Sequence, residues 1–325
     1  ILPAQEGIRD LDSSLVGSEM CIRDRGYAEL GLAEDYFELG GIAAVTAALA
    51  ATESITVGLG VLSARVRHPA VTAMELATVG AMYPDRFIAG IGHGVPYWTG
   101  QMGLRPKSYI NSMREGASGI RRLLDGQELT ETGEYYAFDG VSLLHPPAEY
   151  VPLYFGVHGP RSLELAGELA DGTLLGWFTS PDSVRWARER IDEGRASAGR
   201  DDDCPIVALL VLSIDDDDPA AARAELREWA SHFLAAQAGR PETLATETGR
   251  RLDAAVAARS SDDDVLPDEL IGRFMAAGTS ADVAGFAERL LDAGAERVVL
   301  VPNPSGQRSL EGMLEQIHRG TFLLE

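Results

Sequence analysis

One stretch, residues 54–94, constrains the fold more than the rest of the chain. It contains an apolar strand pattern at Ile55–Val61, a helical pattern at Ala70–Met82 and a second strand pattern at Arg86–Ile91, with glycine near the end of each strand. Such a unit pairs two parallel strands and places the connecting helix on one face of the sheet. The carboxyl ends of parallel strands are where α/β proteins bind their ligands.

Strand and helix patterns alternate along almost the whole chain. Several strand patterns are apolar and β-branched throughout, which is typical of strands buried on both faces. The strand patterns are Glu29–Ala33, Ile55–Val61, Arg86–Ile91, Leu153–Val157, Gly172–Gly176, Ile206–Ser213 and Arg297–Val301. The helical patterns are Ile42–Ala51, Ala70–Met82, Tyr109–Leu124, Ser162–Leu169, Pro181–Ser197, Pro219–Ala236 and Ser280–Ala293.

These patterns, with Ile1-Leu2-Pro3 as the tail of an eighth strand, predict an α/β protein with a (β/α)8 barrel and insertions. We expect one barrel domain over residues 1–325. The alternative is an open doubly wound sheet, but such a fold concentrates its glycines in the first unit, whereas here they are spread along the chain. The expected insertions are a hairpin at Glu131–Phe138 and a polar, acidic excursion or lid at Gly239–Pro267.

Residues 12–25 interrupt this rhythm. Their apolar side chains form no stripe of helical period, although a barrel requires an amphipathic helix here. The segment resembles a translated sequencing-adapter read-through. We therefore expect these residues to be non-native and the first βα unit to be incomplete.

Composition narrows the class of function. The net charge of −22 argues against nucleic acid and anionic membrane surfaces, because a polyanion would be repelled. The two cysteines form no disulfide framework, and no apolar run reaches the ~18 residues of a membrane span. No histidine is spaced with Cys, Asp or Glu as a metal site requires. These features predict a cytoplasmic protein without a catalytic metal.

Seven short segments, in order, carry a resemblance to the luciferase-like monooxygenase superfamily. Among its members, the deazaflavin branch that uses coenzyme F420 is the most similar. The resemblance implies a (β/α)8 barrel with insertions. The segments are Leu32–Tyr36, Val57–Val61, Arg67–Pro69, Tyr83–Arg86, Gly90–Gly94, Gly156–Arg161 and Leu165–Gly172.

The resemblance also implies a set of cofactor-binding residues. Gly60 and Val61 match the place of a non-prolyl cis peptide that lies behind the central ring of the flavin or deazaflavin. Gly92, His93 and Gly94 match the segment that contacts the side chain and ring edge of the cofactor. Gly156, Val157, His158 and Gly159 lead into a helix whose N-terminus would bind the cofactor phosphate.

Catalytic candidates follow from the same comparison. Asp35 and Tyr36 match an aspartate–histidine pair beside the reactive face, with tyrosine in place of histidine, and His93 lies at the next predicted strand end. Val95 replaces the glutamate proton donor of the sugar-phosphate dehydrogenases, so glucose-6-phosphate specificity does not transfer. Trp98 and Trp177 are the expected walls of the substrate pocket.

The expected function is therefore hydride transfer between coenzyme F420 and an unidentified small organic substrate. The first alternative keeps the fold but uses FMN and O2 as a monooxygenase. The second is a barrel that binds flavin without catalysis. Relatives are commonly dimers, so a homodimer is also expected.

Overall fold

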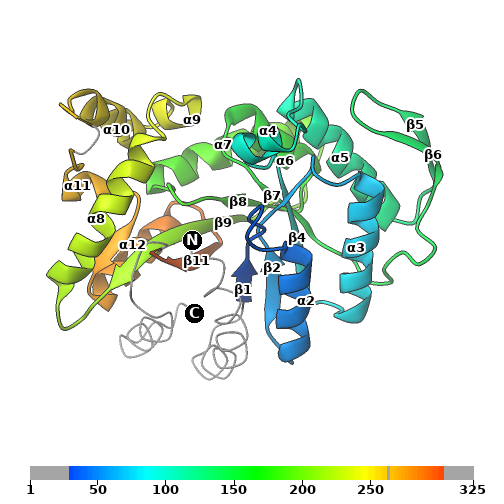
Figure 1. Cartoon of the computed structure of the whole chain (residues 1–325), viewed down its shortest axis with the longest axis horizontal. Coiled ribbons are helices and arrows are strands. Elements are labelled where there is room, and N and C mark those ends of the chain that lie inside the picture. Colours follow the sequence, from blue (N-terminus) through cyan, green and yellow to red (C-terminus); the bar gives the residue numbers. More distant parts are fainter. Residues whose placement is uncertain (1–28, 262–263, 304–325) are drawn as a thin grey trace.

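A computed structural model describes residues 29–261 and 264–303. Within these residues a curved parallel sheet forms the centre of the molecule, and helices cover its outer face (Figure 1). The principal strands are β1 (Glu29–Leu32), β2 (Thr56–Leu59), β4 (Phe87–Gly92), β7 (Leu153–Gly156), β8 (Gly172–Leu175), β9 (Ile206–Ile214) and β11 (Arg297–Pro302).

The principal strands pair in chain order. β1 pairs with β2, β2 with β4, β4 with β7, β7 with β8, β8 with β9 and β9 with β11, and every pair is parallel. The two ends of this series approach each other, because Arg297 on β11 forms an ion pair of 3.0 Å with Glu29 on β1. The sheet therefore curls as a barrel does, which confirms the predicted fold and excludes the open doubly wound sheet.

Helices connect the strands on the outside. In Figure 1, α2, α3 and α5 lie on one flank, and α8 and α12 lie on the other. The helices of the βα units are α2 (Gly41–Ala51), α3 (Pro69–Met82), α5 (Tyr109–Leu124), α6 (Pro160–Leu169), α7 (Pro181–Ala198), α8 (Pro219–Ala235) and α12 (Ser280–Asp292).

The core follows from the apolar faces of these elements. Phe155, Ile91 and Leu153 are fully buried in the sheet, and Leu49 and Leu76 meet them from the helices. A second apolar cluster lies between β9 and α8. There Val211, Leu226 and Met275 pack together.

Both predicted insertions are present. The hairpin consists of β5 (Leu129–Thr132) and β6 (Ala137–Val141), which pair antiparallel and project beyond α5 (Figure 1). The acidic excursion contains α9 (Pro241–Leu244) and α10 (Glu247–Ala257). Asp182, in the first turn of α7, accepts a hydrogen bond of 2.9 Å from the Thr248 amide of α10.

Several short elements were not predicted. These are β3 (Leu62–Ser63), α4 (Pro96–Gln101), α11 (Asp268–Ile271) and β10 (Ala276–Gly278). Each spans too few residues to show a period in the sequence. The predicted eighth strand at Ile1–Pro3 and the anomalous segment 12–25 lie outside the described residues, so both stay predictions.

A buried ion pair joins the loops at the carboxyl end of the sheet. Both guanidinium nitrogens of Arg67 donate to the Glu34 carboxylate at 2.7 Å, and the Gly41 amide at the start of α2 donates to the same carboxylate at 3.2 Å. The Glu34 side chain is only 2% exposed. Glu34 therefore connects the end of β1 to the starts of both α2 and α3.

We expect Glu34→Gln to lower the free energy of unfolding by about 3 kcal/mol, because the substitution leaves the half-buried Arg67 without its main counter-charge. Glu75→Gln is the matched control. Glu75 contacts Arg67 at 3.3 Å but is 31% exposed, so its loss should cost less than about 1 kcal/mol. Urea unfolding measures both changes, and equal effects would contradict the assigned role of Glu34.

Candidate active site

The predicted site residues lie where the principal strands end. Asp35 and Tyr36 follow β1, Gly60 and Val61 follow β2, and His93 follows β4. The segments after β7 and β8 supply Gly156–Gly159 and Trp177. Because the strands are parallel, these segments share one end of the sheet.

At this end of the sheet, the Val61 side chain packs against glycines of the neighbouring strands. The Gly60–Val61 peptide bond is cis, as the resemblance implied. A Cβ atom on Gly92 would lie 2.7 Å from Val61 Cγ2, and one on Gly156 would lie 2.7 Å from Val61 Cγ1. A Cβ on Gly90 would lie 1.9 Å from the Leu59 carbonyl oxygen and 2.9 Å from Val61 Cγ1. These glycines thus provide the space that the Val61 side chain fills.

Tyr36 follows β1 at the same end of the sheet. Its hydroxyl oxygen accepts a hydrogen bond of 3.3 Å from the Ser63 amide, and its ring meets Trp98 edge-on with centroids 5.9 Å apart. Burial raises the pKa of Tyr36 to about 12, so the phenol is neutral near pH 7. The Ser63 side chain also forms a hydrogen bond with this hydroxyl.

Asp35 lies at the start of a tight turn. The Asp35 carbonyl accepts hydrogen bonds from the amides of Glu38 and Leu39, at 3.0 and 2.9 Å. Partial burial raises the pKa of the Asp35 carboxyl, and the nearby Glu38 raises it further. The turn places Asp35 and Tyr36 at the same strand end, as predicted.

His93 joins two elements of the site. Its Nε2 atom lies 2.8 Å from Ser162 Oγ on α6, and its ring meets Tyr109 edge-on with centroids 6.0 Å apart. Burial lowers the pKa of His93 to about 4, so the imidazole is neutral. The Nδ1 atom is buried and lacks a hydrogen-bond partner in this structure. A buried polar atom without a partner marks a place where a ligand can bind.

The start of α6 has no side-chain cap. Gly159 occupies the N-cap position and makes no side-chain cap hydrogen bond, and Pro160 is the first helical residue. Ser162, the nearest hydroxyl, is engaged by His93. The positive end of the helix dipole is therefore not neutralised by a side chain of this segment.

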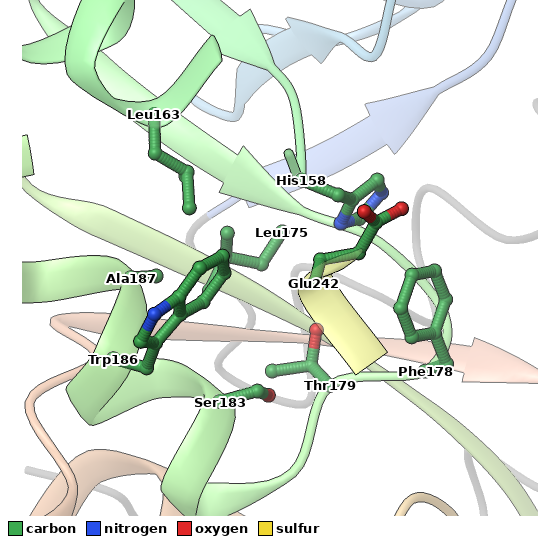
Figure 2. Close-up of a pocket in the computed structure, with 9 residues that line it drawn as sticks. All are labelled: His158, Leu163, Leu175, Phe178, Thr179, Ser183, Trp186, Ala187 and Glu242. Atoms are coloured by element: carbon green, nitrogen blue, oxygen red, sulfur yellow. The ribbon is translucent and has the colours of Figure 1, made fainter. Parts of the chain in front are cut away.

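His158 lines a small cavity rather than an open cleft. The cavity of about 20 Å³ has room for one water molecule, which is far too small for a cofactor. Glu242 of α9 lines this cavity together with His158 (Figure 2). Burial lowers the pKa of His158 to about 4, and the cationic Arg240 lowers it further. The remaining lining residues are Leu163, Leu175, Phe178, Thr179, Ser183, Trp186 and Ala187.

The two predicted pocket tryptophans lie in different groups. Trp98 packs against Tyr36, whereas Trp177 packs against Trp229 and Phe233 of α8, with ring centroids 6.0 and 5.9 Å apart. Trp177 belongs to the second apolar cluster and is only partly buried. The structure thus brings Trp98, but not Trp177, into contact with a catalytic candidate.

Three polar residues of the site were not predicted. Ser63, Tyr109 and Ser162 contact Tyr36 or His93, yet each looks in the sequence like an ordinary loop or helix residue. Their roles depend on contacts between distant segments. Only the position of Ser162 near a predicted helix start offered a signal.

Residues 29–261 and 264–303 lack features that other classes of function require. In these residues no group of three His, Cys, Asp or Glu side chains is arranged to bind a metal ion. Nor does any of their helices combine the length and the apolarity that crossing a bilayer requires.

The chain is similar to known proteins along most of its length. The chain is 30% identical over 289 residues to 5,10-methylenetetrahydromethanopterin reductase of Archaeoglobus fulgidus, covering 85% of each protein. It is 31% identical over 288 residues to F420-dependent glucose-6-phosphate dehydrogenase of Nocardia farcinica, covering 85% of this chain and 80% of that protein.

The fold has a close structural counterpart. The coenzyme F420 dependent tetrahydromethanopterin reductase of Methanopyrus kandleri superposes with a TM-score of 0.75 at 24% identity, covering 94% of each chain. Residues 22–297 match the family model described as luciferase-like monooxygenase. With its curled parallel sheet and the site at the strand ends, the chain belongs to the luciferase-like monooxygenase family.

Proposed function

We propose that this protein is an oxidoreductase that uses coenzyme F420 to exchange a hydride with a small organic substrate. The observation that carries the proposal is similarity along most of the chain to two proteins whose names state F420-linked or methanopterin reductase chemistry. The neutral, hydrogen-bonding residues at the strand ends support it.

The residues present fit such a cofactor. Val61 offers an apolar surface to a flat ring, and the buried His93 Nδ1 atom lacks a partner that a ligand could supply. The uncapped start of α6 at Gly159 would bind the phosphate. The small cavity beside His158 does not fit the cofactor, so His158 is proposed only to shape the loop that precedes α6.

When bound, the cofactor supplies or accepts a hydride, so that reduction converts a substrate C=O into CH–OH and leaves the deazaflavin oxidised. Tyr36 then provides the proton. Its hydroxyl donates to the substrate oxygen, and the amide and side chain of Ser63, which both hydrogen-bond the Tyr36 hydroxyl, stabilise the phenolate that remains. Solvent returns the proton to Tyr36 after the reaction.

His93 and Asp35 take supporting roles in this proposal. The neutral His93 orients α6 through Ser162 and offers Nδ1 to the cofactor. Burial and the nearby Glu38 raise the pKa of the Asp35 carboxyl, which precedes Tyr36 in the chain.

Two other functions predict different binding. A monooxygenase that uses FMN and O2 would bind FMN tightly, and a flavin-binding barrel without catalysis would bind a cofactor but turn over no substrate. The family name leaves the first of these open.

We first expect fluorescence titration to show tight binding of coenzyme F420 and weaker binding of FMN. Gly159→Asp should weaken F420 binding at least about 100-fold, because a carboxylate would then face the phosphate. Aspartate is a favoured N-cap residue, so the variant should keep or raise its melting temperature. Gly159→Ala is the control, since the nearest atom to its Cβ would be Ser162 Oγ at 3.8 Å. Unchanged affinity in the Asp variant would refute the phosphate site.

Tyr36→Phe should lower kcat about 10²- to 10⁴-fold on the first carbonyl or alcohol substrate identified, while F420 affinity stays the same. The ring contact with Trp98 is retained, so only the proton donor is lost. Because the pKa values of His93 and Tyr36 are about 4 and about 12, neither group should produce a titration step in kcat between those values. A variant with normal kcat would exclude Tyr36 as the acid.

We also propose that the protein forms a homodimer through α2 and α3. The outward face of α3 carries Val71, Met74 and Met82, which are 44%, 53% and 54% exposed. No residue of α2 is charged, and Glu75 of α3 pairs with Arg67. In a chain of net charge −22, an uncharged outer face is where a second copy can approach without repulsion.

Met74→Glu should therefore convert a dimer into a monomer in analytical ultracentrifugation, because two added carboxylates would face each other across the symmetry axis. Leu144→Glu is the matched control, since Leu144 is 87% exposed and lies outside both helices. A wild-type protein that stays monomeric at micromolar concentration would refute this interface.

A further inference from the structure

Phe37 combines two features that are unfavourable for a phenylalanine in a folded chain. Its side chain is 69% exposed, and its backbone has φ of +70°, a left-handed conformation that disfavours bulky residues. Asp85, the other such non-glycine residue among those described, is of a type that tolerates this conformation. Asparagine or glycine at position 37 would remove both costs, so the fold itself gains nothing from phenylalanine here.

The turn around Phe37 is complete without its side chain. Backbone hydrogen bonds between Asp35 and Leu39, at 3.2 and 2.9 Å, close the turn and leave Phe37 at its tip. The preceding residue, Tyr36, contacts Trp98. Phe37 therefore lies within one residue of the proposed proton donor and projects into solvent.

α4 and its N-cap residue carry two further exposed apolar side chains. Val95 and Tyr97 are 43% and 68% exposed, and Tyr97 is the neighbour of Trp98 in the chain. Each partner of the Tyr36–Trp98 contact is thus next in the chain to an exposed apolar residue. We name Phe37, Val95 and Tyr97 the apolar rim.

Two cations near this rim are already engaged, and the turn itself carries the carboxyl groups of Asp35 and Glu38. Arg67 binds the carboxylates of Glu34 and Glu75. Arg105 donates to the Pro96 carbonyl at 3.3 Å and packs along Gly100 of α4. An anionic substrate would find no uncompensated cation beside Tyr36 among these groups, whereas an apolar one would cover the exposed side chains.

We propose that the substrate is an uncharged molecule with an extended apolar body, and that the apolar rim binds this body while Tyr36 meets its oxygen. This inference rests on the proposed function and specifies its substrate class. Burial of the rim by substrate supplies the apolar contacts that the fold alone leaves unmade.

The test uses the F420-loaded full chain and a series of methyl ketones from propanone to nonan-2-one, with tryptophan fluorescence and calorimetry as readouts. The dissociation constant should fall about threefold for each added methylene. Two anionic probes, 4-oxopentanoate and glucose 6-phosphate, should bind more weakly than the uncharged ketone of similar size. Equal binding along the series, or tighter binding of the anions, would overturn the proposal.

Phe37→Asn separates a binding role from a structural one. The variant should bind nonan-2-one about tenfold more weakly, with unchanged F420 affinity and an unchanged or higher melting temperature, because asparagine accepts the left-handed conformation. Phe37→Leu should restore most of the affinity. Leu144→Ala, an exposed apolar truncation away from the rim, should change nothing.

The remaining outcomes are also decisive. If Phe37→Asn dissociates a dimer, Phe37 belongs to a subunit contact and the proposal fails. If F420 itself does not bind, the proposed function fails, and the ketone series measured on the free chain still decides the rim: a dependence on chain length supports it and a flat series overturns it.

Discussion

The packing of Val61 against glycines is the constraint on which the site depends. The Val61 side chain occupies space that a Cβ on Gly90, Gly92 or Gly156 would fill, so strands β4 and β7 must carry glycine where they pass beneath it. Close packing of this kind resists even one added methyl group. It fixes the end of β2 relative to its neighbours, and thereby fixes the base on which Tyr36 and His93 are arranged.

Neutral groups dominate the surroundings of this base. Tyr36 and His93 have pKa values displaced to about 12 and about 4, each chiefly because burial disfavours its charged form. Glu34 and Arg67 form an ion pair at the edge of the site, so their opposite charges compensate each other. Hydride addition to a carbonyl carbon places new negative charge on the carbonyl oxygen. A site with few net charges and a hydroxyl donor suits such a reaction.

How much the sequence predicted depended on how local each signal was. Strands such as Ile206–Ile214, apolar along their length, and helices such as Tyr109–Leu124 were predicted to within one or two residues, because burial imposes a period on many positions. The His93–Ser162 pair was not predicted, since it joins side chains 69 residues apart. Trp177 was expected in the wall of the pocket, and in the structure it packs against Trp229 and Phe233 of α8. The strand ends could be located from sequence, but side-chain directions there depend on tertiary packing.

The same His93–Ser162 contact accounts for the lack of a serine cap at the start of α6. A serine in the first turn of a helix normally competes to satisfy the free backbone amides. Here the hydroxyl lies 2.8 Å from His93 Nε2, and the N-cap residue is Gly159, which has no side chain to offer. Contact with His93 also joins the end of β4 to the helix that would bind the phosphate. The same two segments are also joined by the parallel pairing of β4 with β7, which places Gly92 beside Gly156, so the hydrogen bond adds a side-chain contact to an existing backbone connection.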